Sequence, residues 1–318
     1  MNRPPEYRQV KISRREACRA LAGGLALGAL SPGRLAAEPA SPWRPNYVLA
    51  SSMYGTLPLA EILPEVRKTG AGEIDLWPPV HGDQRKAIDE LGFEAFEALL
   101  EKFDVRLAGT TRFDLGPFRL AEEIAVLKRL GGHTVVATPF AEAGRRNLVG
   151  EEARKAVGEF VEKMRPTTAA AAEAGVTVAV ENHASSIVCS PDSIRYLGDL
   201  APEAGLGVAL APYHLPQDPQ LLAGLVEHLG DKLALFYAWQ YGEGCVKKLP
   251  KEQELKQMPG RGPLDFGPVM AALGKIRFRG PFEIFMHPVP RGIPILPTVA
   301  ETTDEINRAR AYLEDLIE

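Results

Sequence analysis

The sequence predicts an α/β protein that folds as a (β/α)8 TIM barrel over residues 38–318. Eight short apolar or β-branched runs follow one another after residue 46, and segments of helical periodicity lie between them. Runs that are apolar on both faces and alternate with helices are typical of a parallel sheet covered by helices. Eight such units in about 280 residues match the usual size of a closed barrel. An open doubly wound sheet is less favoured, because Ser51–Gly55 lacks the glycine-rich phosphate turn expected after its first strand.

The predicted strands are short and rich in aliphatic residues. They are Tyr47–Ala50, Glu73–Trp77, Val105–Gly109, Thr134–Thr138, Thr177–Glu181, Gly207–Ala211, Leu233–Ala238 and Phe282–Phe285. Among the helices, the segment Glu152–Met164 carries apolar side chains at i, i+3, i+4 and i+7 from Val157 onward. The final helix is expected to begin at a capping box formed by Thr302 and Glu305.

Residues 1–37 have the composition of an export signal. A basic head precedes the uncharged run Ala20–Leu30, which is too short to span a bilayer core of about 30 Å. The pair Arg14-Arg15 lies just ahead of this run and resembles a twin-arginine pattern, and Leu35–Ala37 offers small residues for cleavage. We therefore predict a twin-arginine-type signal and a periplasmic or otherwise exported protein. A disordered basic leader is the alternative.

Charge and composition exclude several partners for the rest of the chain. Of 318 residues, 45% are hydrophobic and 25% charged, as in an ordinary globular protein. Removing the leader would change the formal net charge from −4 to −9, and no basic stripe follows it, so nucleic acid is not expected as a partner. No later segment is long and apolar enough for a membrane span. Cys189 and Cys245 would remain, enough for one bridge at most, and a homo-oligomer is compatible with the sequence.

Three strand ends carry polar residues suited to chemistry. Glu181-Asn182-His183 ends the fifth predicted strand, Ala211–His214 follows the sixth, and Glu283 lies in the eighth, four residues before His287. Active sites of such barrels lie at the carboxyl ends of the strands. Glu181 and Glu283 are flanked by apolar residues, so both carboxylates should be partly shielded from water and need a compensating cation or donor.

Several of these segments resemble the xylose isomerase-like barrels, which include sugar isomerases, ketose epimerases and apurinic endonucleases. The similarity covers nearly all of the chain after the leader. The segments that carry it are Arg165-Pro166 through Ala172, Gly175-Val176, Val180–Asn182, Gly260–Phe266 and Glu283.

The resemblance implies a divalent cation held by a Glu, an Asp, a His and a Glu at the ends of strands five to eight. Glu181 and Glu283 occupy the two Glu positions, but the Asp position is Ala211 and the His position falls on Tyr237. Imidazoles could complete a rearranged site for Zn²⁺, Mn²⁺, Ni²⁺ or Co²⁺. The cofactor that the resemblance implies is a divalent metal ion such as Mn²⁺, Mg²⁺, Zn²⁺ or Co²⁺. The predicted metal ligands are Glu181, His214, Glu283 and His287.

Other polar and aromatic residues are candidates for substrate binding, each with a structural alternative. Trp77 could stack against a sugar ring or anchor the core, and Arg261 could reach an anionic or hydroxylated substrate or lie exposed on its loop. The full set is Trp77, His81, His183, Tyr237, Gln240 and Arg261.

The resulting functional hypothesis is an isomerase or epimerase that acts on a keto-sugar or polyol. Glu181 and Glu283 would transfer a proton next to a carbonyl, while a cation or imidazole stabilises the enediolate oxygen. The same chemistry would serve a keto-sugar lyase or dehydratase. A non-catalytic sugar-binding barrel is a further alternative, whereas the acidic charge opposes an apurinic endonuclease.

Overall fold

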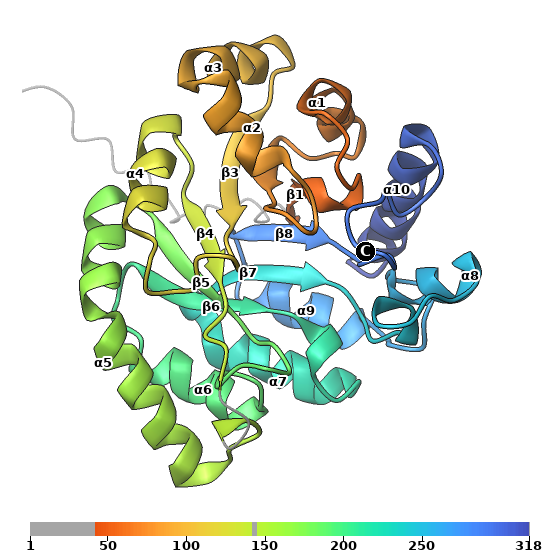
Figure 1. The fold of residues 1–318 in the computed structure, drawn as a ribbon. Helices are drawn as coiled ribbons and strands as arrows, with labels where there is room; N and C mark the ends of the chain where they lie inside the picture. Colours follow the sequence, from red (N-terminus) through yellow and green to blue (C-terminus); the bar gives the residue numbers. More distant parts are fainter. Residues whose placement is uncertain (1–41, 142–144, 318) are drawn as a thin grey trace, which may run out of the picture. The chain divides into compact units, whose positions relative to one another are not determined.

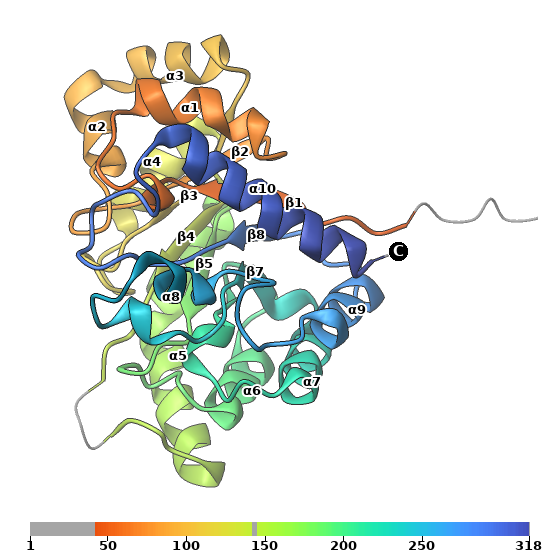
Figure 2. The same cartoon turned by 90° about the vertical axis from the view of Figure 1, so that its right-hand side faces the viewer.

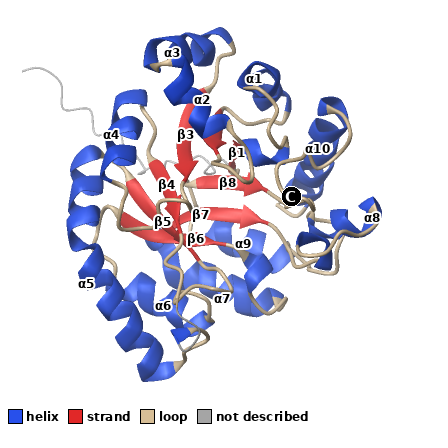
Figure 3. Ribbon diagram, viewed as in Figure 1, coloured by secondary structure: helices blue, strands red, loops and turns tan. Residues whose placement is uncertain are grey.

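The structure, a computed structural model, describes residues 42–141 and 145–317. The predicted export leader, residues 1–37, lies outside the described residues. Trp43 to Glu318 form one compact unit. The fold of this unit is shown in Figure 1, and the same ribbon coloured by element in Figure 3 has the strands at the centre and helices around them.

The strands form a closed barrel in sequence order, and every neighbouring pair is parallel. The ring closes where Asn46 and Tyr47 of the first strand pair with Pro281 and Phe282 of the last. The predicted (β/α)8 barrel is therefore confirmed. The strands are β1 Asn46–Ala50, β2 Glu73–Leu76, β3 Arg106–Thr111, β4 Thr134–Ala137, β5 Thr177–Glu181, β6 Leu206–Leu210, β7 Leu233–Ala238 and β8 Pro281–Ile284.

Helices follow the strands and cover the barrel. The α-helices are α1 Leu59–Lys68, α2 Gln84–Leu91, α3 Phe93–Lys102, α4 Ala121–Leu130, α5 Gly150–Ala174, α6 Pro191–Leu200, α7 Pro219–Leu229, α8 Lys251–Glu254, α9 Gly267–Lys275 and α10 Val299–Asp315. Short 3-10 helices occupy Ser51–Met53, Pro212–His214, Gly230–Lys232, Glu243–Cys245 and Leu255–Gln257. Figure 2 shows the last α-helix, α10, running alongside α1 and β8.

Strand β3 is longer than predicted because Gly109 does not end it. A Cβ at this position would lie 2.2 Å from the carbonyl oxygen of Thr134, so the close approach of β3 to β4 requires glycine. The strand continues to Thr111, whose hydroxyl reaches Asp75 inside the barrel.

The predicted start of the last helix is wrong by one turn. The capping box of α10 is formed by Thr298 and Glu301, and Thr298 has the extended backbone of an N-cap. Thr302 and Glu305 match the same sequence pattern, but both are buried within the helix. Glu305 instead binds Arg261 and Arg308.

Two further features complete the fold. Cys189 and Cys245 are separate free thiols in the structure. Among residues 42–141 and 145–317, no helix combines the length and apolar character needed to cross a membrane.

Candidate active site

A cavity of about 750 Å³ opens at the carboxyl ends of the barrel strands. Its residues are Glu181 at the end of β5 and others from the segments that follow strands β2 to β8, as expected for this fold. One carboxyl side chain, Glu181, and one guanidinium, Arg291, line it together with histidines and aromatic rings. These rings belong to His81, His183, His214, His287, Phe113, Phe140, Tyr213, Trp239 and Tyr241.

Glu181 is the last residue of β5 and is only 4% exposed. Its Oε1 lies 3.6 Å from Nε2 of His214, and its Oε2 has no hydrogen-bond partner. Burial raises the pKa of Glu181 to about 7, while His183 acts in the opposite direction. A carboxyl group with this pKa can take up and release a proton near neutral pH.

The four histidines of the cavity stand in two pairs. The ring centroids of His183 and His214 are 4.2 Å apart, and those of His81 and His287 are 4.5 Å apart. Burial is the main cause that lowers the pKa of all four, to about 4 for His81 and His214. The imidazoles are therefore neutral at neutral pH and can act as hydrogen-bond donors or acceptors.

The tautomer of His183 follows from its hydrogen bonds. Its Nδ1 accepts from the backbone N–H of Ser185 at 3.2 Å and lies 2.8 Å from the hydroxyl of the same residue. The neutral ring then carries its proton on Nε2. His183 can thus donate a hydrogen bond to a ligand oxygen.

One wall of the cavity is aromatic. The ring of Tyr213 stacks on Trp239, with centroids 4.0 Å apart and planes inclined by 10°. Trp77, predicted to stack against a sugar, is not among the lining residues. It is fully buried, stacks on Phe285 at 4.9 Å, and contacts the edges of His81 and His287. Trp77 therefore supports the histidines from within the core.

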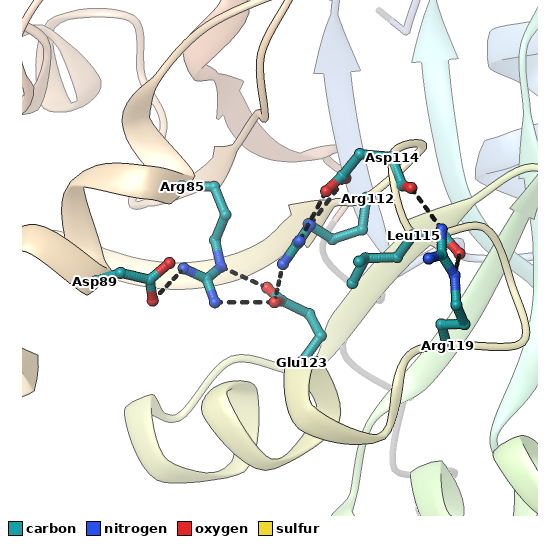
Figure 4. A network of polar contacts seen from close by, with 7 residues as sticks. All are labelled: Arg85, Asp89, Arg112, Asp114, Leu115, Arg119 and Glu123. Carbon is teal, nitrogen blue, oxygen red and sulfur yellow. Dashed lines mark hydrogen bonds and ion pairs between the residues drawn. The ribbon is translucent and has the colours of Figure 1, made fainter.

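The loop that carries Phe113 into the cavity is fixed by buried charges (Figure 4). The neighbouring residue Arg112 pairs with Glu123 of α4, which also binds Arg85 of α2 through two hydrogen bonds of 2.8 and 2.9 Å. Glu123 is 1% exposed and balances both guanidinium groups. This network ties α2, the loop after β3 and α4 together.

A second polar group lies inside the barrel and does not line the cavity. It consists of the carboxyl groups of Asp75 and Glu283 and the phenol of Tyr237. Glu283 is fully buried and neither of its carboxyl oxygens has a partner, whereas Oδ2 of Asp75 accepts from the hydroxyl of Thr111 at 2.6 Å. Burial raises the pKa of Glu283, and the charges of Asp75 and Glu181 raise it further. Glu283 therefore favours its neutral form.

Two other predicted substrate contacts are engaged elsewhere. Gln240 is fully buried, donates to the carbonyl of Met258 at 2.6 Å and accepts from the N–H of Leu264 at 2.9 Å. Arg261 binds Glu305 of α10 through two hydrogen bonds of 2.7 and 2.6 Å. Both residues hold the loop before α9 in place, and neither lines the cavity.

The predicted metal ligands do not gather around one point. Ala211 and Tyr237 stand at the positions of the missing Asp and His, and Glu283 lies outside the cavity lining. Within the described parts of the chain, no group of three or more His, Cys, Asp or Glu side chains is arranged to hold a metal ion. The residues present therefore do not fit the cation that the resemblance implies.

Sequence reasoning missed four residues that matter here. Asp75 shared the signal that identified Glu283, a carboxylate between apolar residues of a strand. Tyr213 and Cys245 lie in short 3-10 helices and Arg291 lies in a loop, all after strands, and no periodicity marks them.

Comparison with known proteins matches residues 63–314 to the family model described as a xylose isomerase-like TIM barrel. No curated protein matches the chain significantly. Three solved structures illustrate the shared fold. D-allulose 3-epimerase from Methylomonas sp., in complex with D-allulose, is 17% identical with a TM-score of 0.56, covering 86% of this chain and 98% of that chain. D-psicose 3-epimerase from Clostridium cellulolyticum H10, with D-tagatose, is 13% identical with a TM-score of 0.61, covering 86% and 99%.

The third structure is the IOLI protein with a bound zinc atom, 17% identical with a TM-score of 0.60, covering 86% of this chain and 98% of that chain. These identities are low, so the structures establish the fold alone. The family match is broader evidence, because it runs from α1 to α10 and takes in every strand from β2 to β8. On this match, the chain belongs to the xylose isomerase-like TIM barrel family.

Proposed function

We propose that the protein is an isomerase or epimerase of keto-sugars or polyols in which Glu181 removes a proton from the carbon next to a carbonyl. The observation that carries the proposal is the state of Glu181. It lines the cavity, has one carboxyl oxygen without a protein partner, and has a pKa of about 7. The fold similarity to ketose 3-epimerases agrees with this chemistry.

The side chains around Glu181 supply the remaining steps. When the carboxylate takes the proton, the electron pair of the C–H bond moves toward the carbonyl oxygen. A hydrogen bond from Nε2 of His183 would stabilise the negative charge that develops there. The hydroxyl proton of the deprotonated carbon moves to the former carbonyl oxygen, and Glu181, after exchanging its proton with water in the cavity, protonates the neighbouring carbon, which gives isomerisation. Return to the opposite face of the same carbon gives epimerisation and needs a second proton donor, for which His214 and His287 are the candidates in the cavity.

Glu283, the predicted second acid, would have to act from outside the cavity lining. Its fully buried carboxyl has no contact with the space a substrate would occupy. We therefore base the proposal on Glu181 and the histidines, and the catalytic role of Glu283 stays a prediction.

The divalent metal also stays a prediction, and no step above depends on it. Two ligand positions are apolar or phenolic, at Ala211 and Tyr237, and two carboxylates alone hold a divalent cation weakly. Metal analysis of the purified protein after incubation with Mn²⁺, Mg²⁺, Zn²⁺ and Co²⁺ tests this. One equivalent of tightly bound metal, lost in Glu181→Gln, would support the predicted site.

Turnover assays test the proposed activity. Keto-sugars and polyols are incubated with the protein, and isomers or epimers are separated by chromatography. Removing a general base lowers the rate by about 10²–10⁴-fold, so Glu181→Gln should lose activity to this extent. Glu162→Gln is the matched control, because Glu162 is an exposed glutamate of α5 that does not line the cavity. Full turnover by Glu181→Gln would refute the assignment.

A non-catalytic sugar-binding barrel is the second candidate, favoured by the missing ligands at positions 211 and 237. It predicts sugar binding without turnover in the wild type. It also predicts that Glu181→Gln leaves every reaction assay unchanged.

A further inference from the structure

Arg291 is the single guanidinium among the residues that line the cavity. It lies in the loop after β8. Its Nη1 donates to the carbonyl of Pro288 at 2.6 Å, and its Nη2 contacts Sγ of Cys245 at 3.3 Å. Among the described residues no carboxylate forms an ion pair with Arg291, in contrast to Arg85 and Arg261, which each bind a buried glutamate. Arg291 therefore brings a positive charge to the cavity without a fixed counter-ion from the part of the chain that the structure describes.

The other charges around the cavity do not neutralise this one. Glu181 and Arg291 line the same cavity without forming an ion pair, and the four histidines are neutral at neutral pH. The charge of Arg291 contributes to the lowered pKa of His81, His183 and His287, so its field acts on both histidine pairs. A ligand in the cavity is exposed to the positive charge of Arg291 at this end.

The Arg291 guanidinium has N–H groups available for a ligand, and hydrogen bonds fix the loop that carries it. A guanidinium has five N–H groups, and the two contacts to Pro288 and Cys245 leave about three of them available. The loop itself is tied to the segment after β1. The carbonyl of Gly292 accepts from the N–H of Thr56 at 3.0 Å, and the N–H of Ile295 donates to the carbonyl of Met53 at 3.0 Å. Arg291 can thus bind an anion with little further ordering.

We propose that the substrate is a sugar acid, a polyhydroxylated ketone whose carboxylate binds Arg291 while its carbonyl end faces Glu181. A guanidinium matches a carboxylate in shape and forms two parallel hydrogen bonds with it. The charge also matches, since the lining contains no lysine and no second arginine to balance a doubly charged phosphate. This inference rests on the proposed function and adds the class of substrate.

Binding measurements with three related probes test it. D-fructose, its C6 carboxylate analogue D-fructuronate and D-fructose 6-phosphate differ only in the group at one end. Isothermal titration calorimetry gives the affinity of each, independently of turnover. Charge-assisted hydrogen bonds correspond to about 10- to 100-fold in affinity, so we expect D-fructuronate to bind tighter than D-fructose by this factor.

Variants of Arg291 show whether this residue causes the preference. Arg291→Gln should lose the preference for D-fructuronate over D-fructose, whereas Arg291→Lys should keep part of it. Circular dichroism melting checks that the variants are folded. Equal affinity of the wild type for D-fructose and D-fructuronate would overturn the proposal, as would a preference that survives in Arg291→Gln.

The remaining outcomes separate this inference from the proposed function. Tighter binding of D-fructose 6-phosphate than of D-fructuronate would overturn the assignment of a carboxylate. Turnover of neutral sugars but not of D-fructuronate would refute the sugar acid and leave the role of Glu181 standing. Selective, Arg291-dependent binding of D-fructuronate in a protein that turns over no sugar would support the inference and refute the proposed catalysis.

Discussion

Replacement of Glu123 by glutamine tests the buried network that fixes the cavity loop after β3. Glu123 is 1% exposed and balances Arg85 and Arg112, whose side chains are 8% and 13% exposed. Loss of one member of a buried ion pair costs about 3–5 kcal/mol, because the remaining charge is left without compensation. Arg85 keeps Asp89 and Arg112 keeps Asp114, both substantially exposed, which moves the expected loss to the lower end.

We therefore expect Glu123→Gln to lower the free energy of unfolding by about 3 kcal/mol. For a domain of this size that corresponds to a fall in melting temperature of roughly 6–12 °C, measured by circular dichroism. Glu162→Gln is the control, since it removes an exposed pair with Arg165 on α5 and should shift the midpoint by about 1 °C or less. A midpoint for Glu123→Gln that coincides with the control would refute the reasoning.

Three other predictions address the interior of the barrel. Burial raises the pKa of Glu181 from 4.5 to about 7, so its stabilising contribution is complete below pH 4.5 and is lost as the pH rises through 7. Relative to Glu181→Gln, the wild type should lose stability between about pH 4.5 and pH 7 in urea titrations, and parallel profiles would contradict this. Glu283→Gln should keep turnover within about tenfold, because the carboxyl does not line the cavity; a loss of about 10²-fold or more would instead support the predicted second acid. Gly109→Ala should destabilise the protein by about 2–3 kcal/mol in the same titrations, because its Cβ would meet the carbonyl of Thr134; wild-type stability would show that β3 and β4 can separate at no cost.

The barrel could be predicted because its strands are buried on both faces. A run such as Thr177–Glu181 is apolar throughout its interior, and a helix of marked amphipathic period precedes it. The end of β3 could not be found in this way, because Gly109 is needed for close packing and glycine otherwise indicates a break.

The candidate site could be predicted where a side chain directly follows a strand. Glu181 ends β5, and His183, His214 and His287 follow β5, β6 and β8 closely, so all four line the cavity. The sequence could not predict how deep a side chain lies within the barrel, because Glu283 has the same apolar sequence neighbours as a residue at the mouth of the cavity.

The sequence also could not predict the direction in which a loop side chain points. Arg261 and Arg291 are both arginines in loops near a glycine, and their sequence contexts do not distinguish them. Only the packing of α10 places Glu305 within reach of Arg261, and only the path after β8 brings Arg291 to the cavity.

The central claim is that the carboxyl group of Glu181 carries a proton between solvent and a substrate carbon, and isotope transfer tests it most directly. The reaction is run in deuterated water, and the product is analysed by NMR for deuterium at the carbon next to the carbonyl. We expect deuterium at that carbon with the wild-type protein and product formation about 10²–10⁴-fold slower with Glu181→Gln. Product that forms at the full rate with no solvent deuterium would contradict the claim, because the hydrogen would then reach its new carbon without exchange with solvent.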